Sequence, residues 1–275
     1  MAYLLKSLFL LSFVGLLQKC ALPNKSVSPS ERRLVWSDEF NGSGLPDSTK
    51  WGYDMGTGCP DICGWGNNEL EFYTARRPEN ARVENGILLI EARREKWKEN
   101  KEYTSARLVS KHKGDWKYGR IEARIKCPSG RGTWSAFWML PTDWKYGGWP
   151  RSGEIDIMEH VGFKSDTVFA TAHTASFTNT KGTENTRSFF LPDVESAFHV
   201  YAVEWRADRM DFFVDDVRYN TFVNQHKTAD EWPYDQRFHI ILNLAVGGNW
   251  GGAKGVDETI WPRKMEVDYV RVYAF

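Results

Sequence analysis

The sequence predicts an all-β domain, a sandwich of two antiparallel, curved sheets with an open concave cleft. Short apolar runs, and runs of alternating apolar and polar residues, recur along the chain, as buried and half-buried strands require. Clusters of Gly, Pro, Asn and Asp separate these runs, and no long stretch repeats its apolar residues with the helical period of 3.6. Many short strands with turn-rich connections favour a sandwich, and a curved sheet can form a cleft that suits a polymer.

Each predicted strand follows from a local pattern. Residues 86–92 form a short apolar run, whereas residues 119–126 alternate apolar and polar side chains, as a half-buried strand should. Asp215 and Asp216 predict a hairpin turn, because aspartate tolerates the positive φ that such turns need. The other predicted strands are residues 199–205, 210–214, 238–246 and 265–273.

Composition and charge limit the class of ligand. The chain has 275 residues, which suits one large domain with a substantial buried core. Its 36 Lys and Arg balance its 36 Asp and Glu, so no global field would attract nucleic acid or an anionic membrane. Many of the 13 Trp, 11 Tyr and 16 Phe must be core residues, but flat rings are also surfaces on which sugars stack. A neutral ligand fits this balance best.

The N-terminus is typical of an export signal. Lys6 supplies a positive charge, and residues 8–17 form an apolar stretch that is short for a membrane span. We therefore expect residues 1–20 to be a signal peptide, with a hydrophobic core segment as the alternative. No other segment of the sequence resembles a transmembrane helix.

A cysteine and a polar tether follow this signal. Cys20 resembles the lipidated cysteine of bacterial lipoproteins, and a lipid there would hold the protein at the cell surface or outer membrane. Plain secretion or release into the periplasm is the alternative. Residues 21–33 are polar with two prolines and predict a flexible tether, so the folded domain should span residues 34–275. A lipid on Cys20 would be its only contact with a membrane.

The other three cysteines predict structural roles. Cys59 and Cys63 are close enough in sequence to form a disulfide in an oxidising compartment. A zinc site would need further ligands, and no histidine lies nearby. Cys127 is predicted to be a buried free thiol.

The most informative segment carries three carboxylates within six residues. Alternation along a strand places Glu154 and Asp156 on one face, but it turns Glu159 toward the core. Because an unpaired carboxylate in an apolar core is costly, we expect one extra residue near Met158. Such a β-bulge returns Glu159 to the face of Glu154, and bulges are over-represented beside active sites.

Three acids this close repel one another, so at least one should hold a proton near neutral pH. Retaining glycoside hydrolysis needs this arrangement, because one carboxylate attacks the anomeric carbon while a carboxylic acid protonates the leaving oxygen. The two groups lie roughly 5–5.5 Å apart in such enzymes, a span that one strand can supply. A solvated acidic strand face or a Ca²⁺ site would explain the same residues.

Seven ordered motifs carry a resemblance to glycoside hydrolase family 16, of the laminarinase-like type. They are residues 36–40 (WSDEF), 65–73 (WGNNELEFY), 105–108 (SARL), 132–141 (GTWSAFWMLP), 149–159 (WPRSGEIDIME), 243–250 (NLAVGGNW) and 267–273 (VDYVRVY). The resemblance implies a β-jelly-roll and a double-displacement mechanism that needs no cofactor. Carried over by position, Glu154 is the nucleophile, Asp156 assists it and tunes the charge, and Glu159 is the acid/base.

Further residues are candidates for substrate binding. Trp134 and Trp138 are four residues apart, and even spacing on a strand places both indoles on one face. Burial of both in the core is the alternative. The resemblance places at least one of them against a bound glucose, and it implies that His173 faces the catalytic acids. A lone histidine is otherwise more often structural.

Three loops complete the predicted substrate site. Asn67 and Glu69 match a sugar-contacting loop of the family, although a turn at residues 66–68 would explain the asparagine equally well. Asn249 and Trp250 match the aromatic cleft loop. Arg151 should either stabilise the loop before Glu154 or touch the substrate.

The resemblance also implies a structural Ca²⁺ on the convex side. By position, Glu39, Gly86 and Asp268 would supply its ligands, partly through backbone carbonyls, and oxygen ligands suit this ion. The sequence pattern alone does not group these residues.

The expected function is that of a retaining endo-glycosidase acting on β-1,3-glucan, and on mixed-linkage β-1,3/1,4-glucan as the nearest rival substrate. The expected partner is a β-glucan polysaccharide, with no nucleic acid, and the protein is expected to be a monomer. A non-catalytic glucan-binding module is the first alternative. A family member acting on another polysaccharide, such as a sulfated galactan, is the second.

Overall fold

The computed structural model describes residues 32–275. The predicted signal peptide, Cys20 and residues 21–31 of the predicted tether therefore lie outside the described residues. Within the described part, β1 begins at Arg33, one residue before the predicted start of the domain, and pairs with the last strand. No helix of the described part is long and apolar enough to cross a membrane.

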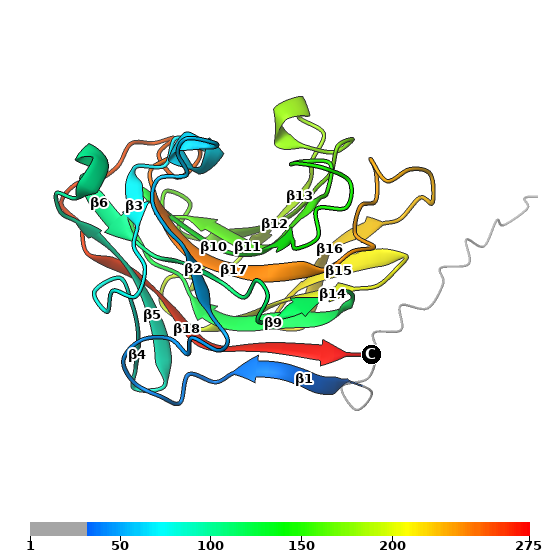
Figure 1. Cartoon of the computed structure of the whole chain (residues 1–275), viewed down its shortest axis with the longest axis horizontal. Helices are drawn as coiled ribbons and strands as arrows, with labels where there is room; N and C mark the ends of the chain where they lie inside the picture. Colours follow the sequence, from blue (N-terminus) through cyan, green and yellow to red (C-terminus); the bar gives the residue numbers. More distant parts are fainter. Residues whose placement is uncertain (1–31) are drawn as a thin grey trace, which may run out of the picture.

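The described residues form two sheets packed face to face (Figure 1). The ten-stranded sheet has the order β16-β15-β14-β9-β18-β5-β6-β3, with β1 beside β18 and β4 beside β5. Its strands are β1 (Arg33–Asp38), β3 (Glu71–Tyr73), β4 (Ala81–Glu84), β5 (Ile87–Arg94), β6 (Tyr103–Ser105), β9 (Gly119–Lys126), β14 (His199–Trp205), β15 (Arg209–Val214), β16 (Val217–Val223) and β18 (Arg263–Ala274).

The eight-stranded sheet has the order β13-β12-β11-β10-β17-β7-β2, with β8 beside β17. Its strands are β2 (Gly52–Asp54), β7 (Arg107–Val109), β8 (Asp115–Trp116), β10 (Thr133–Pro141), β11 (Glu154–Val161), β12 (Thr167–His173), β13 (Asn185–Phe190) and β17 (Phe238–Val246). Short 3-10 helices lie in the loops at η2 (Cys63–Gly66), η3 (Lys98–Asn100) and η4 (Asn179–Lys181).

The predicted fold class is confirmed, with one local difference. Strands pair antiparallel in both sheets, except that β3 and β6 run parallel. β9, β14 and β17 have the predicted bounds, whereas β5, β15 and β18 differ by one to two residues at one or both ends. The predicted hairpin turn joins β15 to β16, and both of its central residues, Asp215 and Asp216, have positive φ (46° and 65°).

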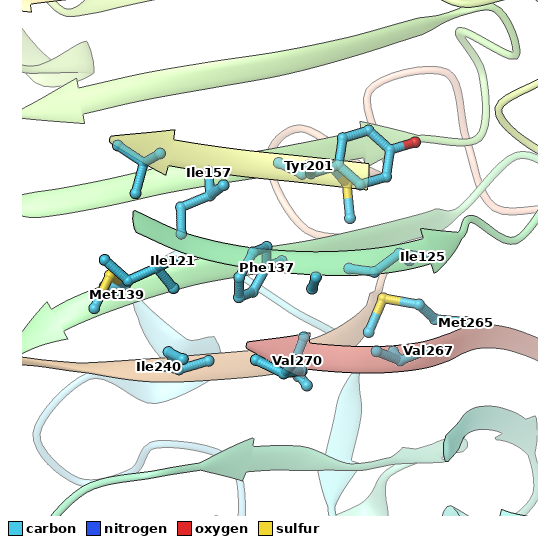
Figure 2. Close-up of a cluster of buried hydrophobic side chains, with 14 of the residues drawn as sticks. Ile121, Ile125, Phe137, Met139, Ile157, Tyr201, Ile240, Met265, Val267 and Val270 are labelled. Atoms are coloured by element: carbon cyan, nitrogen blue, oxygen red, sulfur yellow. The ribbon is translucent and has the colours of Figure 1, made fainter. Parts of the chain in front are cut away.

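A single apolar core lies between the sheets and decides which side chains face outward. In Figure 2, Phe137 of β10 and Ile157 of β11 lie near Ile121 of β9 and Val270 of β18, all of them buried. Burying one such side chain contributes roughly 1.5–3 kcal/mol. Because side chains alternate along a strand, the inward position of Phe137 directs its neighbours on β10 to the opposite side. We call that side the open face of the eight-stranded sheet.

Loops rise above the open face at both ends of the sheet (Figure 1). One end carries β3, β6 and the loop that contains η2, and the other carries the connection from β12 to β13. A disulfide joins Cys59 and Cys63 in the first of these loops, a bond that the sequence allowed but did not decide. Cys127 is a buried free thiol, as predicted.

Candidate active site

A β-bulge places three carboxylates of β11 on the open face. We call them the acid triad: Glu154, Asp156 and Glu159. Between the second and third of these acids, β11 advances three residues while the facing strand β12 advances two. The pairing with β10 shifts at the same point. The extra residue of the bulge lies at Ile157 and Met158, and both side chains are fully buried in the core. The predicted bulge is therefore present, and it turns Glu159 away from the core.

Burial and mutual repulsion raise the pKa values of the acid triad. Burial is the main cause for all three acids. The charge of Asp156 adds to it at Glu159, and together they raise the pKa of Glu159 to about 8. Burial also raises the pKa of Glu154 above its ordinary 4.5, but the nearby His173 opposes this shift. Near neutral pH, the triad thus offers a protonated Glu159, while the charge of His173 favours the ionised form of Glu154.

His173 faces the acid triad from β12, as the family resemblance implies. Its Nε2 lies 3.2 Å from Asp156 Oδ2 and 4.0 Å from Glu154 Oε1. Burial disfavours the imidazolium, but the hydrogen bond and charge of Asp156, followed by the charges of Glu154 and Glu159, raise the pKa of His173 to about 9. A positive charge therefore lies among the acids and favours their ionised forms.

An aromatic cluster lies beside Glu159. The Nε1 of Trp134 donates to Glu159 Oε1 at 3.1 Å. Trp250 packs edge-on against Trp134 and against Phe169, with ring centroids 5.6 Å and 4.9 Å apart. Trp134 and Trp250 are both half-buried, so each keeps part of its ring accessible. Trp134 and Trp250, both predicted to bind substrate, thus lie together beside one acid of the triad.

Trp149 is a site residue to which the sequence analysis gave no role. Its Nε1 donates to Glu154 Oε2 at 2.8 Å, and its ring lies 6.2 Å from that of His173. Trp149 remains 42% exposed. An available signal was its position in a glycine-rich loop, five residues before Glu154.

Trp138 lies on the same face as Trp134, and Arg107 supports it. Its Nε1 donates to Asn243 Oδ1 at 2.7 Å. The guanidinium of Arg107 lies 4.8 Å from the ring of Trp138 and 4.5 Å from that of Trp65. Arg107 is buried and also pairs with Asp54 at 3.0 Å. Sequence reasoning missed this stack, because Arg107 and Trp65 come from distant segments.

The two predicted polar loops lie side by side. The backbone N of Asn249 donates to Asn67 O, and the side chain of Asn68 donates to Asn249 Oδ1, both at 2.7 Å. Glu69 is buried, and its carboxylate accepts hydrogen bonds from Asn67 at 3.3 Å and from Tyr73 at 3.1 Å. Tyr73 in turn accepts from Asn243 at 3.0 Å. Glu69 therefore connects to Trp138 through hydrogen bonds by way of Tyr73 and Asn243.

Arg151 lies apart from these contacts. The side chain of Arg151 is exposed, and its backbone N donates to Gly148 O within the loop before Glu154. Its contact with substrate stays a prediction.

The carboxylates of two proposed calcium ligands are engaged in ion pairs. Glu39 binds Arg271 at 2.7 Å and Asp268 binds Arg124 at 2.5 Å. Gly86 lies between β4 and β5 with a φ of 78°. Side-chain ligation by either carboxylate would have to compete with an arginine, so calcium binding here stays a prediction.

Within residues 32–275, one group of three acidic or histidine side chains has the spacing of a metal site. It consists of Glu154, Asp156 and His173, whose ligand atoms all lie within 4.8 Å of one another. These residues belong to the acid triad and its histidine, so the Ca²⁺ alternative of the sequence analysis concerns the same site.

The chain resembles proteins that act on β-glucans. The model of glycosyl hydrolases family 16 matches residues 68–271. A β-glucanase of Rhodothermus marinus is 53% identical over 249 residues, covering 88% of this chain and 85% of that protein. A glucan endo-1,3-β-glucosidase of Cryptopygus antarcticus is 40% identical over 257 residues, covering 88% and 92%.

Among solved structures, a non-specific endo-β-1,3(4)-glucanase was crystallised as a mutant with 1,3-β-D-cellotriosyl-glucose. It is 44% identical, covers 90% of this chain and 96% of its own, and has a TM-score of 0.85. Family match, identity and shared fold agree with the geometry of the acid triad. The chain belongs to glycosyl hydrolases family 16.

Proposed function

We propose that the protein is a retaining endo-β-1,3-glucanase. The observation that carries this proposal is the bulged strand β11, which presents Glu154 and Glu159 on one face lined by tryptophans. Burial raises the pKa of Glu159 and favours its protonated form, whereas the charge of His173 favours the ionised form of Glu154. Retaining glycoside hydrolysis requires these two protonation states in neighbouring carboxyl groups.

In the first step, Glu154 attacks the anomeric carbon while Glu159 transfers its proton to the departing glycosidic oxygen. A covalent glycosyl-enzyme forms and the chain end leaves with that proton. In the second step, the ionised Glu159 removes a proton from water, which attacks the same carbon and releases Glu154. Two inversions give retained configuration. The Trp149 N–H at Glu154 Oε2 and the positive His173 keep Glu154 oriented and ionised.

The relatives support a glucan as substrate. Two of them are named for β-glucan cleavage, and the solved glucanase was crystallised with a glucan oligosaccharide. The half-buried rings of Trp134, Trp138 and Trp250 offer flat surfaces for successive glucose units. A chain that crosses the open face at the acid triad would be cut internally. Mixed-linkage glucan is a second proposed substrate.

The two alternatives fit less well. A non-catalytic glucan-binding module has no need of three clustered carboxylates, one buried and two half-buried, beside a charged histidine, which are costly to maintain. A sulfated polymer requires free cationic groups. Arg107 does not provide one, because its guanidinium lies between two indoles and pairs with Asp54.

A product profile tests the proposed function. Purified protein would be incubated with laminarin, mixed-linkage β-glucan, cellulose and agarose, and the products separated over time. We expect short oligosaccharides early in the laminarin digest, with little free glucose. Hydrolysis of agarose in place of both glucans, or no hydrolysis at all, would contradict the proposal.

We also propose that the protein is exported and acts as a monomer. The apolar N-terminus and Cys20 support this localisation, and analysis of the mature N-terminus should find about the first 20 residues missing, since cleaved signals are typically 15–30 residues long. A Cys20→Ser variant would leave the membrane fraction if the cysteine carries a lipid.

The structural Ca²⁺ at Glu39, Gly86 and Asp268 is likewise proposed, and a chelator that leaves the melting temperature unchanged would argue against it.

A further inference from the structure

One segment holds the loop that leads into Glu154. Residues 233–237 are the last part of the connection from β16 to β17, and we call them the clamp segment (Figure 1). Residues 143–153 precede Glu154 and carry Trp149, and we call them the nucleophile loop. Four successive side chains of the clamp segment, from Tyr234 to Arg237, contact either this loop or the backbone at the adjoining ends of β11 and β12.

Tyr234 joins the two strands that carry Glu154 and His173. Its hydroxyl donates to the backbone carbonyl oxygen of His173 at 2.7 Å and lies 3.2 Å from that of Glu154. These two residues face each other across β11 and β12. Tyr234 is fully buried, and its own carbonyl accepts from Trp205 Nε1 at 3.1 Å. A rigid, core-anchored hydroxyl therefore fixes the ends of both strands.

Gln236 holds the two ends of the nucleophile loop together. Its Nε2 donates to Ser152 O at 3.1 Å and to Pro233 O at 2.9 Å. Its Oε1 accepts from the backbone N of Lys145 at 2.8 Å. Gln236 is buried, so these bonds have little competition from water. The loop between Lys145 and Ser152, which carries Trp149, is thus closed by one side chain.

The outer half of the clamp segment adds charged contacts. Asp235 accepts from Tyr146 Oη at 2.7 Å and from Lys145 Nζ at 2.9 Å. Arg237 binds Asp143 through two nitrogens at 2.5 and 3.1 Å. These groups are more exposed, so we expect them to contribute less than the buried pair.

The backbone leaves no room for a side chain between the clamp segment and β11. Gly153 directly precedes Glu154 and has a φ of 84°. A Cβ at this position would lie 2.9 Å from Pro233 Cγ and 2.9 Å from Tyr234 Cε1. The glycine therefore permits the close approach that brings the Tyr234 hydroxyl to the backbone of Glu154.

We propose that Tyr234 and Gln236 are positioning residues for the reaction, which set the placement of Glu154 and Trp149 relative to His173. This inference rests on the proposed role of Glu154 as nucleophile. Both side chains are buried and bind backbone atoms. Their effect passes through the backbone of β11, β12 and the nucleophile loop.

Loss of the Tyr234 hydroxyl should loosen the alignment of β11 and β12 and weaken the contact of His173 with the acids. The ionisable groups that face His173 are Glu154, Asp156 and Glu159, all from β11, and their charges raise its pKa. If they move away, the pKa of His173 falls toward its ordinary value. A hydroxyl that acts only on global stability would not change this pKa.

The test compares Tyr234→Phe with wild type and with Tyr53→Phe. Tyr53 has a hydroxyl that is buried without a hydrogen-bond partner, on a strand at the far edge of the sheet, so it controls for loss of a buried oxygen. We expect kcat on laminarin to fall about ten- to a hundredfold in Tyr234→Phe, as for misplaced reacting groups. KM should change little, because the tryptophans of β10 are untouched.

Titration of the histidine ring protons by NMR gives a readout that needs no hydrolysis. The His173 signal is assigned by its loss in His173→Gln. We expect a lower His173 pKa in Tyr234→Phe and an unchanged one in Tyr53→Phe. If Tyr234→Phe unfolds, Gln236→Met serves in its place, with kcat again expected to fall at nearly constant KM.

A normal kcat together with an unchanged His173 pKa in Tyr234→Phe would overturn the positioning role. That outcome leaves the proposed function intact, since wild type would still cut laminarin. Failure of wild type on every glucan would overturn the proposed function instead, and the NMR titration would still report whether Tyr234 aligns the two strands.

Discussion

The hydrogen bond from Trp134 to Glu159 should set the alkaline limit of activity. Trp134 Nε1 donates to Glu159 Oε1 at 3.1 Å, which favours the ionised carboxylate and lowers the pKa of Glu159. Trp134→Phe removes this donor and keeps an aromatic ring. A hydrogen bond to a charged group contributes about 1.5–3 kcal/mol, and 1.36 kcal/mol corresponds to one pKa unit. The pKa of Glu159 should therefore rise further above its value of about 8.

The first step needs the protonated form of Glu159, so activity is lost as pH rises through the pKa of this group. The alkaline limb of kcat/KM should move to higher pH by about one to two units in Trp134→Phe. The assay is reducing-sugar release from laminarin at low substrate concentration, measured across the pH range.

Trp250→Phe is the matched control, because Trp250 packs against Trp134 in the same cluster and its contacts there are between rings. Its alkaline limb should stay in place. An alkaline limb that is unchanged or moves to lower pH in Trp134→Phe would refute the assignment of Glu159 as the acid.

Three further predictions concern the neighbourhood of the triad. Asp156→Asn removes a charge that raises the pKa of Glu159, so the alkaline limb of kcat/KM should move to lower pH. The rate should fall less than in Glu154→Ala, and an alkaline limb that moves to higher pH would contradict this prediction. Gly153→Ala should lower the free energy of unfolding in urea by about 1–3 kcal/mol, whereas Gly148→Ala, which meets no atom within 4 Å, should change it little. Cys127, whose pKa burial raises to about 12, should react with iodoacetamide only after denaturation, and rapid labelling of native protein would count against its burial.

The bulge in β11 was predictable because its cause is local. Strict alternation would bury the carboxylate of Glu159, and one extra residue avoids that cost. The structure places Ile157 and Met158 in the core for the same reason. Likewise, the spacing of Trp134 and Trp138 predicted their shared face, since β10 pairs with β17 without interruption.

The supporting contacts were not predictable from the pattern, because they join residues that are distant in sequence. Tyr234 lies 80 positions from Glu154, and Trp138 lies 105 positions from Asn243. Whether such distant residues meet depends on how all the strands of the sheet pair. Glu69 shows the limit of motif reading, because the structure buries it in a hydrogen-bond network with Tyr73 rather than exposing it in a loop.

The central claim is that Glu154 is the nucleophile and Glu159 the acid/base, and the stereochemistry of azide rescue tests it most directly. In Glu154→Ala, azide replaces the missing nucleophile, so an activated aryl glucoside substrate should give a glycosyl azide of inverted configuration. In Glu159→Ala, the glycosyl-enzyme still forms and azide replaces water, so the product should have retained configuration. NMR of the anomeric proton in each rescued product decides the matter. Inversion from the Glu159 variant, or retention from the Glu154 variant, would show that the two roles are reversed.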